Sequence, residues 1–415
     1  MTSLLGIMRL LLTTLPQLLL NGWAATLVLV AVLLVFLQYR RVAIKEAELY
    51  GVSKHGPLEQ TLYSLFMGLV GGVVGSVALS LAGVGLVEVP GAVSALLYLW
   101  PVSVALGAIN PRFLCFAYSG GLVSVIYLLT GWPAVDVPSL MGLIAILHMV
   151  EAFLIWLSGS TCATPMSISG QLDEAVPGFV LQRFWPVPLV LPIFSLFAGS
   201  PVDMPVWWPL LHMDPALIHT AIPFGWKFVP FVVTMGYSDL AISAPPEVRA
   251  RQSSRVLLAY SGLLLLLAVG AGYWRPLMWV AAVFSAVGHE AMAVWSGRVQ
   301  ILAEPYLKRP AKGVGVLDVL PGSAALAAGI RPGSVIVTVD DFEVHSREQL
   351  HEALLSSQAY VRIMFRNGRQ LEHCRVPRPP EGLFGFGVIL LPQQGDKAIA
   401  RLRRPLFFRY SGLEK

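Results

Sequence analysis

Apolar stretches long enough to cross a lipid bilayer constrain this chain more than any other feature of its sequence. The first runs from about Leu18 to Leu37 without a charged residue. A helix needs about 20 apolar residues to span a hydrocarbon core of about 30 Å. The composition agrees, because 56% of the 415 residues are hydrophobic and 13% are charged, whereas a soluble domain has about a quarter charged residues. We therefore predict an integral membrane protein.

Further apolar segments follow the first one. We expect spans at 62–83, 92–109, 110–129, 140–157, 256–272 and 276–295. Two shorter segments flanked by proline, 189–197 and 228–242, could be tilted spans, re-entrant segments or surface helices. The total is therefore seven or nine spans, and both numbers are odd.

The basic residues after the first span predict the orientation. Arg40, Arg41, Lys45 and Lys54 form the densest basic loop of the membrane part. Lysine and arginine are concentrated in cytoplasmic loops, which explains the net charge of +5 better than nucleic-acid binding does. With an odd number of spans in the cell membrane, we expect the N-terminus outside and the C-terminal part in the cytoplasm.

Small residues repeat every four positions along the second span, at Gly68, Gly72, Ser76 and Ser80. Such a stripe lets another backbone approach closely within the membrane, where association depends on packing. We interpret it as an intramolecular packing face rather than as a dimer motif.

Residues 312–376 have the pattern of a small soluble domain. A β-rich run at 316–319 and a buried strand at 335–339 flank a short helix that Gly329 ends. Ser346 and Gln349 form a capping box, and Asn367-Gly368 predicts a hairpin. We therefore divide the chain into a polytopic α-helical membrane domain (1–300), a small α+β domain (301–377) and a tail (378–415).

This α+β domain, with the glycine-rich loop Lys312-Gly313-Val314-Gly315 before its first strand, resembles a PDZ domain of the bacterial, permuted kind. In PDZ domains an extended peptide adds a strand to an exposed sheet edge. The resemblance implies that the peptide lies beside the first strand, with its carboxylate on loop amides. The peptide-binding residues implied are Lys312, Gly313, Val314, Gly315, Val316, Leu317, Leu350, Ala353 and Leu354. The alternative is a small αβ domain without a ligand.

Two segments of the tail have sequence patterns that predict a structure or a contact. Residues 384–391 form an apolar strand candidate, which could complete the domain or occupy its groove. Arg401, Arg403, Arg404 and Arg409 alternate with apolar residues. They predict either a contact with the inner membrane leaflet or a disordered end.

Four ionisable residues fall inside predicted spans: His148, Glu151, His289 and Glu290. Charged groups there cost roughly 2.5–3.5 kcal/mol on insertion scales, so they are usually paired or functional. A metal site made of two histidines and two glutamates is conceivable. We favour a polar latch between two helices, and we assign no metal, cofactor or catalytic residue.

The sequence Gly288-His289-Glu290 near a PDZ-like domain is similar to part of the site-2 metalloprotease motif. Those enzymes need a second histidine four residues after the first, and that position is Ala293. An enzyme is therefore not expected. The alternative hypothesis is an intramembrane protease, or a degenerate relative of one, whose PDZ domain gates substrates.

Several motifs together resemble the MinJ-like proteins, which are division-site determinants of Gram-positive bacteria. They are 110–121, 148–151, 184–188, Gly236-Tyr237-Ser238-Asp239 and Gly288-His289-Glu290. The resemblance implies a scaffold at the septum and cell poles that binds the polar protein DivIVA and recruits the ATPase MinD. A relative with this architecture could also serve another membrane process.

Overall fold

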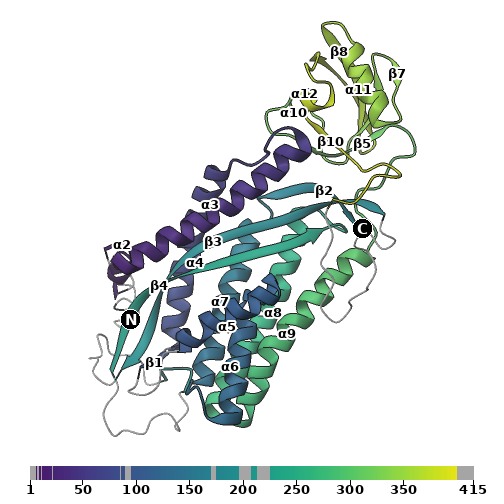
Figure 1. The fold of residues 1–415 in the computed structure, drawn as a ribbon. Helices are drawn as coiled ribbons and strands as arrows, with labels where there is room; N and C mark the ends of the chain where they lie inside the picture. Colours follow the sequence, from purple (N-terminus) through teal and green to yellow (C-terminus); the bar gives the residue numbers. More distant parts are fainter. Residues whose placement is uncertain are drawn as a thin grey trace.

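The computed structural model describes residues 6, 9–10, 12–20, 22–84, 86–88, 95–169, 174–195, 207–212 and 225–399. The basic tail segment at 401–409 lies outside the described residues. Figure 1 shows a bundle of long helices, a pair of long strands beside it, and a small domain at one end.

Among the residues that the structure describes, five helices are long and apolar enough to cross a membrane. They are α3 (Gly22–Tyr50), α4 (Pro57–Ala82), α7 (Val137–Ser158), α8 (Pro246–Tyr273) and α9 (Pro276–Leu302), and the short α2 (Gln17–Leu20) precedes them. Proline occupies the first turn of α4, α7, α8 and α9, where its missing N–H has no partner to lose. These helices agree with the prediction of a polytopic membrane domain.

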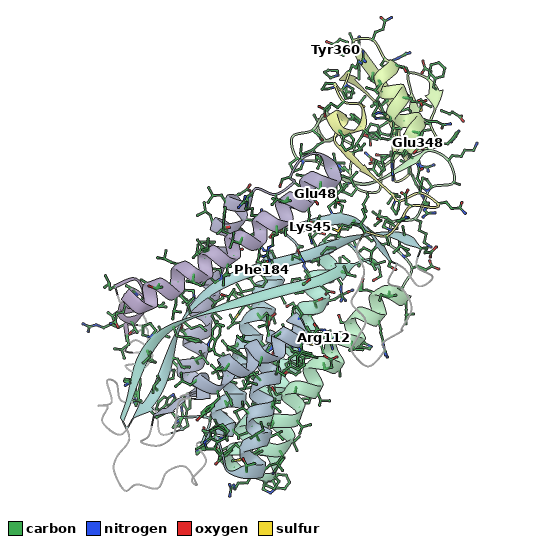
Figure 2. All side chains as sticks on the ribbon, in the orientation of Figure 1. Lys45, Glu48, Arg112, Phe184, Glu348 and Tyr360 are labelled. Atoms are coloured by element: carbon green, nitrogen blue, oxygen red, sulfur yellow. The ribbon has the colours of Figure 1, made fainter. Side chains whose placement is uncertain are left out.

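The expected third and fourth spans form a shorter structure. They are α5 (Ala95–Ile109) and α6 (Phe116–Thr130), joined by the 3-10 helix η1 (Pro111–Leu114). Each has 15 residues, so it is about 22 Å long and shorter than a hydrocarbon core of about 30 Å. Arg112 of η1 pairs with Glu290, near the middle of α9 (Figure 2). The described α5 and α6 are therefore a hairpin whose tip reaches mid-depth, and not two full spans.

The two doubtful segments, 189–197 and 228–242, are not helices in the part of the chain that the structure describes. Most of each belongs to one of two long antiparallel strands, β3 (Ala175–Ser195) and β4 (Gly225–Ala241). Their prolines disfavour a helix, and their β-branched residues favour a strand, so these segments form strands. Two short strands, β1 (Leu86–Glu88) and β2 (Ala163–Ser169), pair with the two ends of β3.

Helix α4 covers the edge of β3 that lies between β1 and β2. A Cβ atom at Gly68 or Gly72 would overlap the carbonyl oxygen of Pro186 or Pro188, so only glycine fits at either position. Farther along the same face, Ser76 Oγ accepts a hydrogen bond of 2.9 Å from the N–H of Val190. The small-residue stripe is therefore an intramolecular packing face, as expected, and its partner is a strand.

The backbone donors along this edge of β3 are satisfied or absent at every second residue. Phe184 N–H donates to Tyr39 Oη of α3, and Val190 N–H donates to Ser76. Between and after them stand Pro186, Pro188 and Pro192, which have no N–H. A strand edge inside a membrane needs this arrangement because lipid offers no hydrogen-bond acceptors.

The C-terminal domain contains a six-stranded sheet. Its strands are β5 (Val314–Val319), β6 (Val335–Val339), β7 (Phe342–Glu343), β8 (Tyr360–Asn367), β9 (Gln370–Pro377) and β10 (Val388–Leu390), in the order β10-β5-β6-β8-β9 with β7 on β6. The helices are α10 (Ala324–Ala327), α11 (Arg347–Ser356) and α12 (Leu383–Phe386). The expected cap by Ser346 is present, since its Oγ accepts from Gln349 N–H. The side chain of Gln349 reaches one residue beyond the N-cap, where its Oε1 accepts from His345 N–H, so the second bond differs from that of a regular capping box. A hairpin joins β8 to β9 as expected, but its two turn residues are Gly368 and Arg369, because Asn367 is paired with Gln370.

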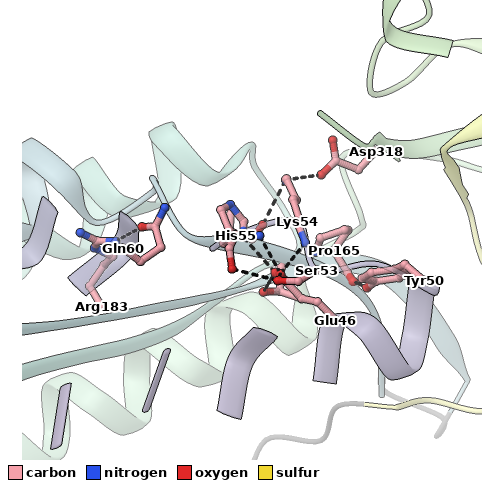
Figure 3. A network of polar contacts seen from close by, with 11 residues as sticks. Glu46, Tyr50, Ser53, Lys54, His55, Gln60, Pro165, Arg183 and Asp318 are labelled. Atoms are coloured by element: carbon pink, nitrogen blue, oxygen red, sulfur yellow. Dashed lines mark hydrogen bonds and ion pairs between the residues drawn. The ribbon is translucent and has the colours of Figure 1, made fainter. Parts of the chain in front are cut away.

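A polar network joins this domain to the loop after α3 (Figure 3). Glu46 Oε1 lies 2.9 Å from His55 Nδ1 and 2.9 Å from Thr164 Oγ1. The other oxygen of Glu46 accepts from the backbone N–H groups of Lys54 and His55. Lys54 Nζ in turn contacts Asp318 of β5. The loop therefore connects a membrane helix directly to the sheet of the C-terminal domain.

Candidate peptide-binding groove

A peptide that adds to a sheet needs a strand with one unpaired edge. Strand β5, where we expected the peptide, is paired with β6 on one side and β10 on the other. The N–H of Val316 donates to Ser334, and the carbonyl of Gly315 accepts from Leu391 N–H. The edge position at this side of the sheet belongs to β10. The predicted strand of the tail, β10, therefore completes the domain. It occupies the edge of the sheet, where we expected β5.

The glycines of the 312–315 loop have structural roles in this arrangement. Gly313 has a φ of +87°, and a Cβ atom there would lie 2.6 Å from the carbonyl oxygen of Ile336. A Cβ atom at Gly315 would overlap the side chain of Leu391, which crosses over it. Lys312 is exposed at the start of the loop, and Val314 lies in the domain core. These residues hold β5 between its neighbours.

Helix α11 turns two of its predicted groove residues inward. Leu350 and Leu354 are fully buried in the core of the domain, and Ala353 packs against that core. The face of α11 directed at β10 carries Arg347, Glu348 and His351 instead. His351 Nδ1 accepts a weak hydrogen bond of 3.4 Å from Leu383 N–H, at the turn that leads into β10.

A cavity of about 560 Å³ lies between α11 and β10. Leu317, the one expected groove residue that faces it, and Val388, Ile389 and Leu390 form its floor on the sheet side. This volume is in the range of ligand pockets, about 300–1,000 Å³. The cavity is thus large enough for several side chains of an extended peptide.

The membrane domain and the tail close one side of this cavity. Tyr50 at the end of α3 and Met166 of β2 belong to its lining. Asp396 forms an ion pair of 2.8 Å with Arg347, and Ile399 N–H donates to Ser167 of β2. A peptide in the groove would therefore contact the membrane domain as well as the PDZ-like domain.

The backbone of β10 offers hydrogen-bonding groups at its outer edge. Gly387 O and Leu391 N–H are bonded to β5. Because N–H and C=O groups alternate in direction along a strand, those of Val388 and Leu390 point away from β5. They are the groups with which an added strand would pair.

Three of the four predicted intramembrane residues, His148, His289 and Glu290, meet at the tip of the α5–α6 hairpin. His148 of α7 and His289 of α9 have ring centroids 5.3 Å apart. Glu290 pairs with Arg112 and accepts a hydrogen bond of 2.8 Å from Tyr118 Oη. Glu151 lies one turn from His148 on α7. The structure adds Cys115 to this group, and no sequence spacing had pointed to that residue.

Comparison with known proteins identifies a relative for more than half of the chain. Over 234 residues the chain is 24% identical to the cell division topological determinant MinJ of Bacillus subtilis. This chain resembles MinJ. The match includes 56% of this chain and 54% of MinJ, so the chain spans about half the length of that relative. No protein-family model matches the chain.

The crystal structure of the PDZ domain of an SdrC-like protein from Listeria monocytogenes is also similar. The likeness covers 20% of this chain and 92% of that domain, at 22% identity and a TM-score of 0.17. The motifs on which the MinJ-like resemblance depends meet in space. Arg112 and Tyr118 from 110–121 contact Glu290, and Phe184 from 184–188 is paired with Gly236 across β3 and β4. The chain is a membrane protein similar to MinJ, and a PDZ-like domain follows its helix α9.

Proposed function

We propose that this chain is a non-enzymatic membrane scaffold of the division site, and that its PDZ-like domain holds extended peptide segments of partner proteins. The observation that carries the proposal is the outer edge of β10, with which no strand of the described residues pairs and which faces α11 across the cavity of about 560 Å³. The similarity to MinJ, a cell division topological determinant, supports the division site as the place of action.

The PDZ-like domain faces the cytoplasm in this proposal, and the N-terminus lies outside. Lys45, labelled in Figure 2, stands in the part of α3 that is nearest to this domain, and Arg40 and Arg41 precede it in the same helix. Lys54 in the following loop contacts the domain itself through Asp318. Because basic residues collect on the cytoplasmic side, the loop and the domain are assigned to that side together.

The bound segment adds a strand to β10 through the outward groups of Val388 and Leu390. Main-chain hydrogen bonds of this kind supply affinity, and side-chain pockets supply specificity. His351 and Arg347 of α11 suit a polar or acidic side chain, and Leu317 with Ile389 suits an apolar one. By resemblance, the partners are DivIVA and MinD, which the scaffold would bridge.

The arrangement of Glu290 favours a scaffold over a protease. A glutamate that acts as a general base must be able to reach a water molecule or the substrate. Both oxygens of Glu290 are engaged, one by Arg112 and the other by Tyr118. The Glu290 carboxylate thus attaches the tip of the α5–α6 hairpin to α9, which is a structural role.

The test is a substitution that removes only the outer edge of β10. Leu390→Pro deletes an N–H that points away from β5, and proline is tolerated on edge strands. Leu390→Ala removes the same side chain but keeps the N–H, so it is the matched control. Both variants should reach the membrane. We expect co-immunoprecipitation of DivIVA- and MinD-type proteins to fail with Leu390→Pro and to persist with Leu390→Ala. Equal recovery by both variants would remove the groove from the proposal.

A further inference from the structure

Three metal-ligating side chains from distant parts of the sequence converge in the middle of the membrane domain. Cys115 precedes α6, His148 lies on α7, and His289 lies on α9. Cys115 Sγ is 3.1 Å from His148 Nε2 and 3.7 Å from His289 Nε2. All ligand atoms of the group lie within 4.8 Å of one another.

These separations match a tetrahedral zinc site. Zinc binds cysteine sulfur at about 2.3 Å and histidine nitrogen at about 2.0–2.1 Å. At the tetrahedral angle these bond lengths place sulfur and nitrogen about 3.5 Å apart. The two observed distances, 3.1 and 3.7 Å, lie on either side of that value. An ion would therefore fit with only small movements of the three side chains.

Outer contacts hold both imidazoles with Nε2 free to bind an ion. His148 Nδ1 lies 2.7 Å from the carbonyl oxygen of Ile144, which can only accept, so the proton is on Nδ1. Tyr118 Oη donates to Glu290, so its oxygen accepts from His289 Nδ1 at 3.1 Å. Metal-binding histidines commonly have their other nitrogen held in this way by a carbonyl or a carboxylate.

The cluster lacks a proton donor if no cation is present. Both Nε2 atoms present lone pairs to Cys115 Sγ, but a thiol carries one proton and can satisfy only one of them. Cys115 Sγ also accepts a hydrogen bond from Ala117 N–H at the start of α6, a place that stabilises a thiolate. A metal ion bound to the thiolate would satisfy both nitrogens at once.

The surroundings of the cluster favour a structural role for such an ion. His148 is buried, and the ring of Tyr260 packs against both imidazoles at 5.6 and 5.7 Å. Cys115 belongs to the tip of the α5–α6 hairpin, which is too short to cross the membrane. An ion at this point joins the tip to the middle of α7 and α9.

We propose that Cys115, His148 and His289 bind one zinc ion, which fixes the tip of the α5–α6 hairpin between α7 and α9. The three protein ligands leave a fourth position for water. This site needs no catalytic step, because Glu290 is held by Arg112 and Tyr118.

The first test measures metal in the full chain, purified in detergent from cells grown with zinc. We expect about one zinc per chain in the wild type and less than about a tenth in Cys115→Ser, His148→Gln and His289→Gln. Cys115→Ser keeps a residue that caps α6 well. Cys162→Ser is the matched control, because Cys162 is a buried cysteine outside the cluster, and it should retain the metal.

A second measurement does not depend on whether the variants fold. Cobalt added to the metal-stripped wild type should give the absorption of a cobalt–thiolate bond, and zinc should remove it. Zinc should also protect Cys115 from a thiol-alkylating reagent. Wild-type protein without bound zinc and without cobalt–thiolate absorption would overturn the proposal, and so would full retention of zinc in all three variants. Copper at the same stoichiometry would overturn the assignment to zinc.

Discussion

Lys54 Nζ lies 2.5 Å from a carboxylate oxygen of Asp318, and this contact joins the loop after α3 to strand β5. Both side chains are largely buried, with 16% and 10% of their surface exposed. Lys54 also donates to the carbonyl oxygen of Ala163 in β2. The PDZ-like domain is therefore held against the membrane domain through a specific ion pair, and not only through the linker after α9.

Breaking this ion pair should release the domain. We expect Lys54→Met or Asp318→Asn to weaken docking by about 1–3 kcal/mol, between the values for exposed and buried pairs. Limited proteolysis of residues 303–312 measures the release. Lys308→Met is the control, because Lys308 and Glu304 form a pair whose side chains are 72% and 81% exposed. Equal protease sensitivity of the Lys54 and Lys308 variants would contradict the prediction.

The same loop should make the stability of the fold sensitive to alkaline pH. Burial lowers the pKa of His55, but hydrogen bonds with Cys162 and Glu46 outweigh it and raise the pKa to about 9. The folded pKa is above the unfolded value of about 6.5, so the protonated ring stabilises the fold. This contribution is complete below about pH 6.5, is lost as the pH rises through about 9, and amounts to roughly 3 kcal/mol at most.

Thermal unfolding in detergent between pH 6 and 10 tests this expectation. The unfolding temperature of the wild type should fall across the upper part of that range. His55→Gln keeps a hydrogen-bonding side chain but does not titrate, so it should start lower and change less. Parallel curves for the two proteins would show that His55 is not the group responsible.

Two glycines of long helices should respond in opposite ways to alanine. A Cβ atom at Gly72 would overlap the carbonyl oxygen of Pro188, whereas one at Gly262 of α8 would meet no described atom within 4 Å. We expect Gly72→Ala to cost about 2 kcal/mol or more by separating α4 from β3. Gly262→Ala should be neutral or stabilising by up to about 1 kcal/mol. Unfolding temperatures of the two variants, measured side by side in detergent, decide the matter.

A larger residue at Gly315 should displace β10 from the sheet. Gly315→Val would push against Leu391, with an expected cost of about 1–3 kcal/mol to the PDZ-like domain. Leu391→Ala should restore part of the loss, because it makes room for the new side chain. Hydrogen exchange of residues 387–391 measures the attachment of β10. Additive effects of the two substitutions would argue against this contact.

The sequence predicts the long helices and most of the PDZ-like domain because residues close together in the chain determine these elements. Apolar length determines α3, α4, α7, α8 and α9, and capping and turn residues determine the domain that follows. Strands β3 and β4 were not predicted. Both faces of β3 are largely buried, so its sequence does not alternate clearly between polar and apolar residues. By its sequence alone it therefore resembles another short membrane span.

The two sites were harder to predict, because distant segments build them. Cys115 and His289 are 174 residues apart, and a single cysteine in an apolar segment gives no ligand spacing. In the PDZ-like domain, the order of elements along the chain placed the groove at β5. The last strand, β10, then took the edge position, which only the tertiary structure reveals.

The prolines of β3 also determine how this strand can align with its neighbours. A shift of β3 by one residue along β4 would turn Pro186, Pro188 and Pro192 towards β4 and remove three ladder hydrogen bonds. It would also direct the N–H groups of the intervening residues at the glycines of α4, which accept nothing there. Each lost or unmade bond costs about 0.5–3 kcal/mol. The contact with helix α4 therefore disfavours any alignment of β3 that is shifted by an odd number of residues.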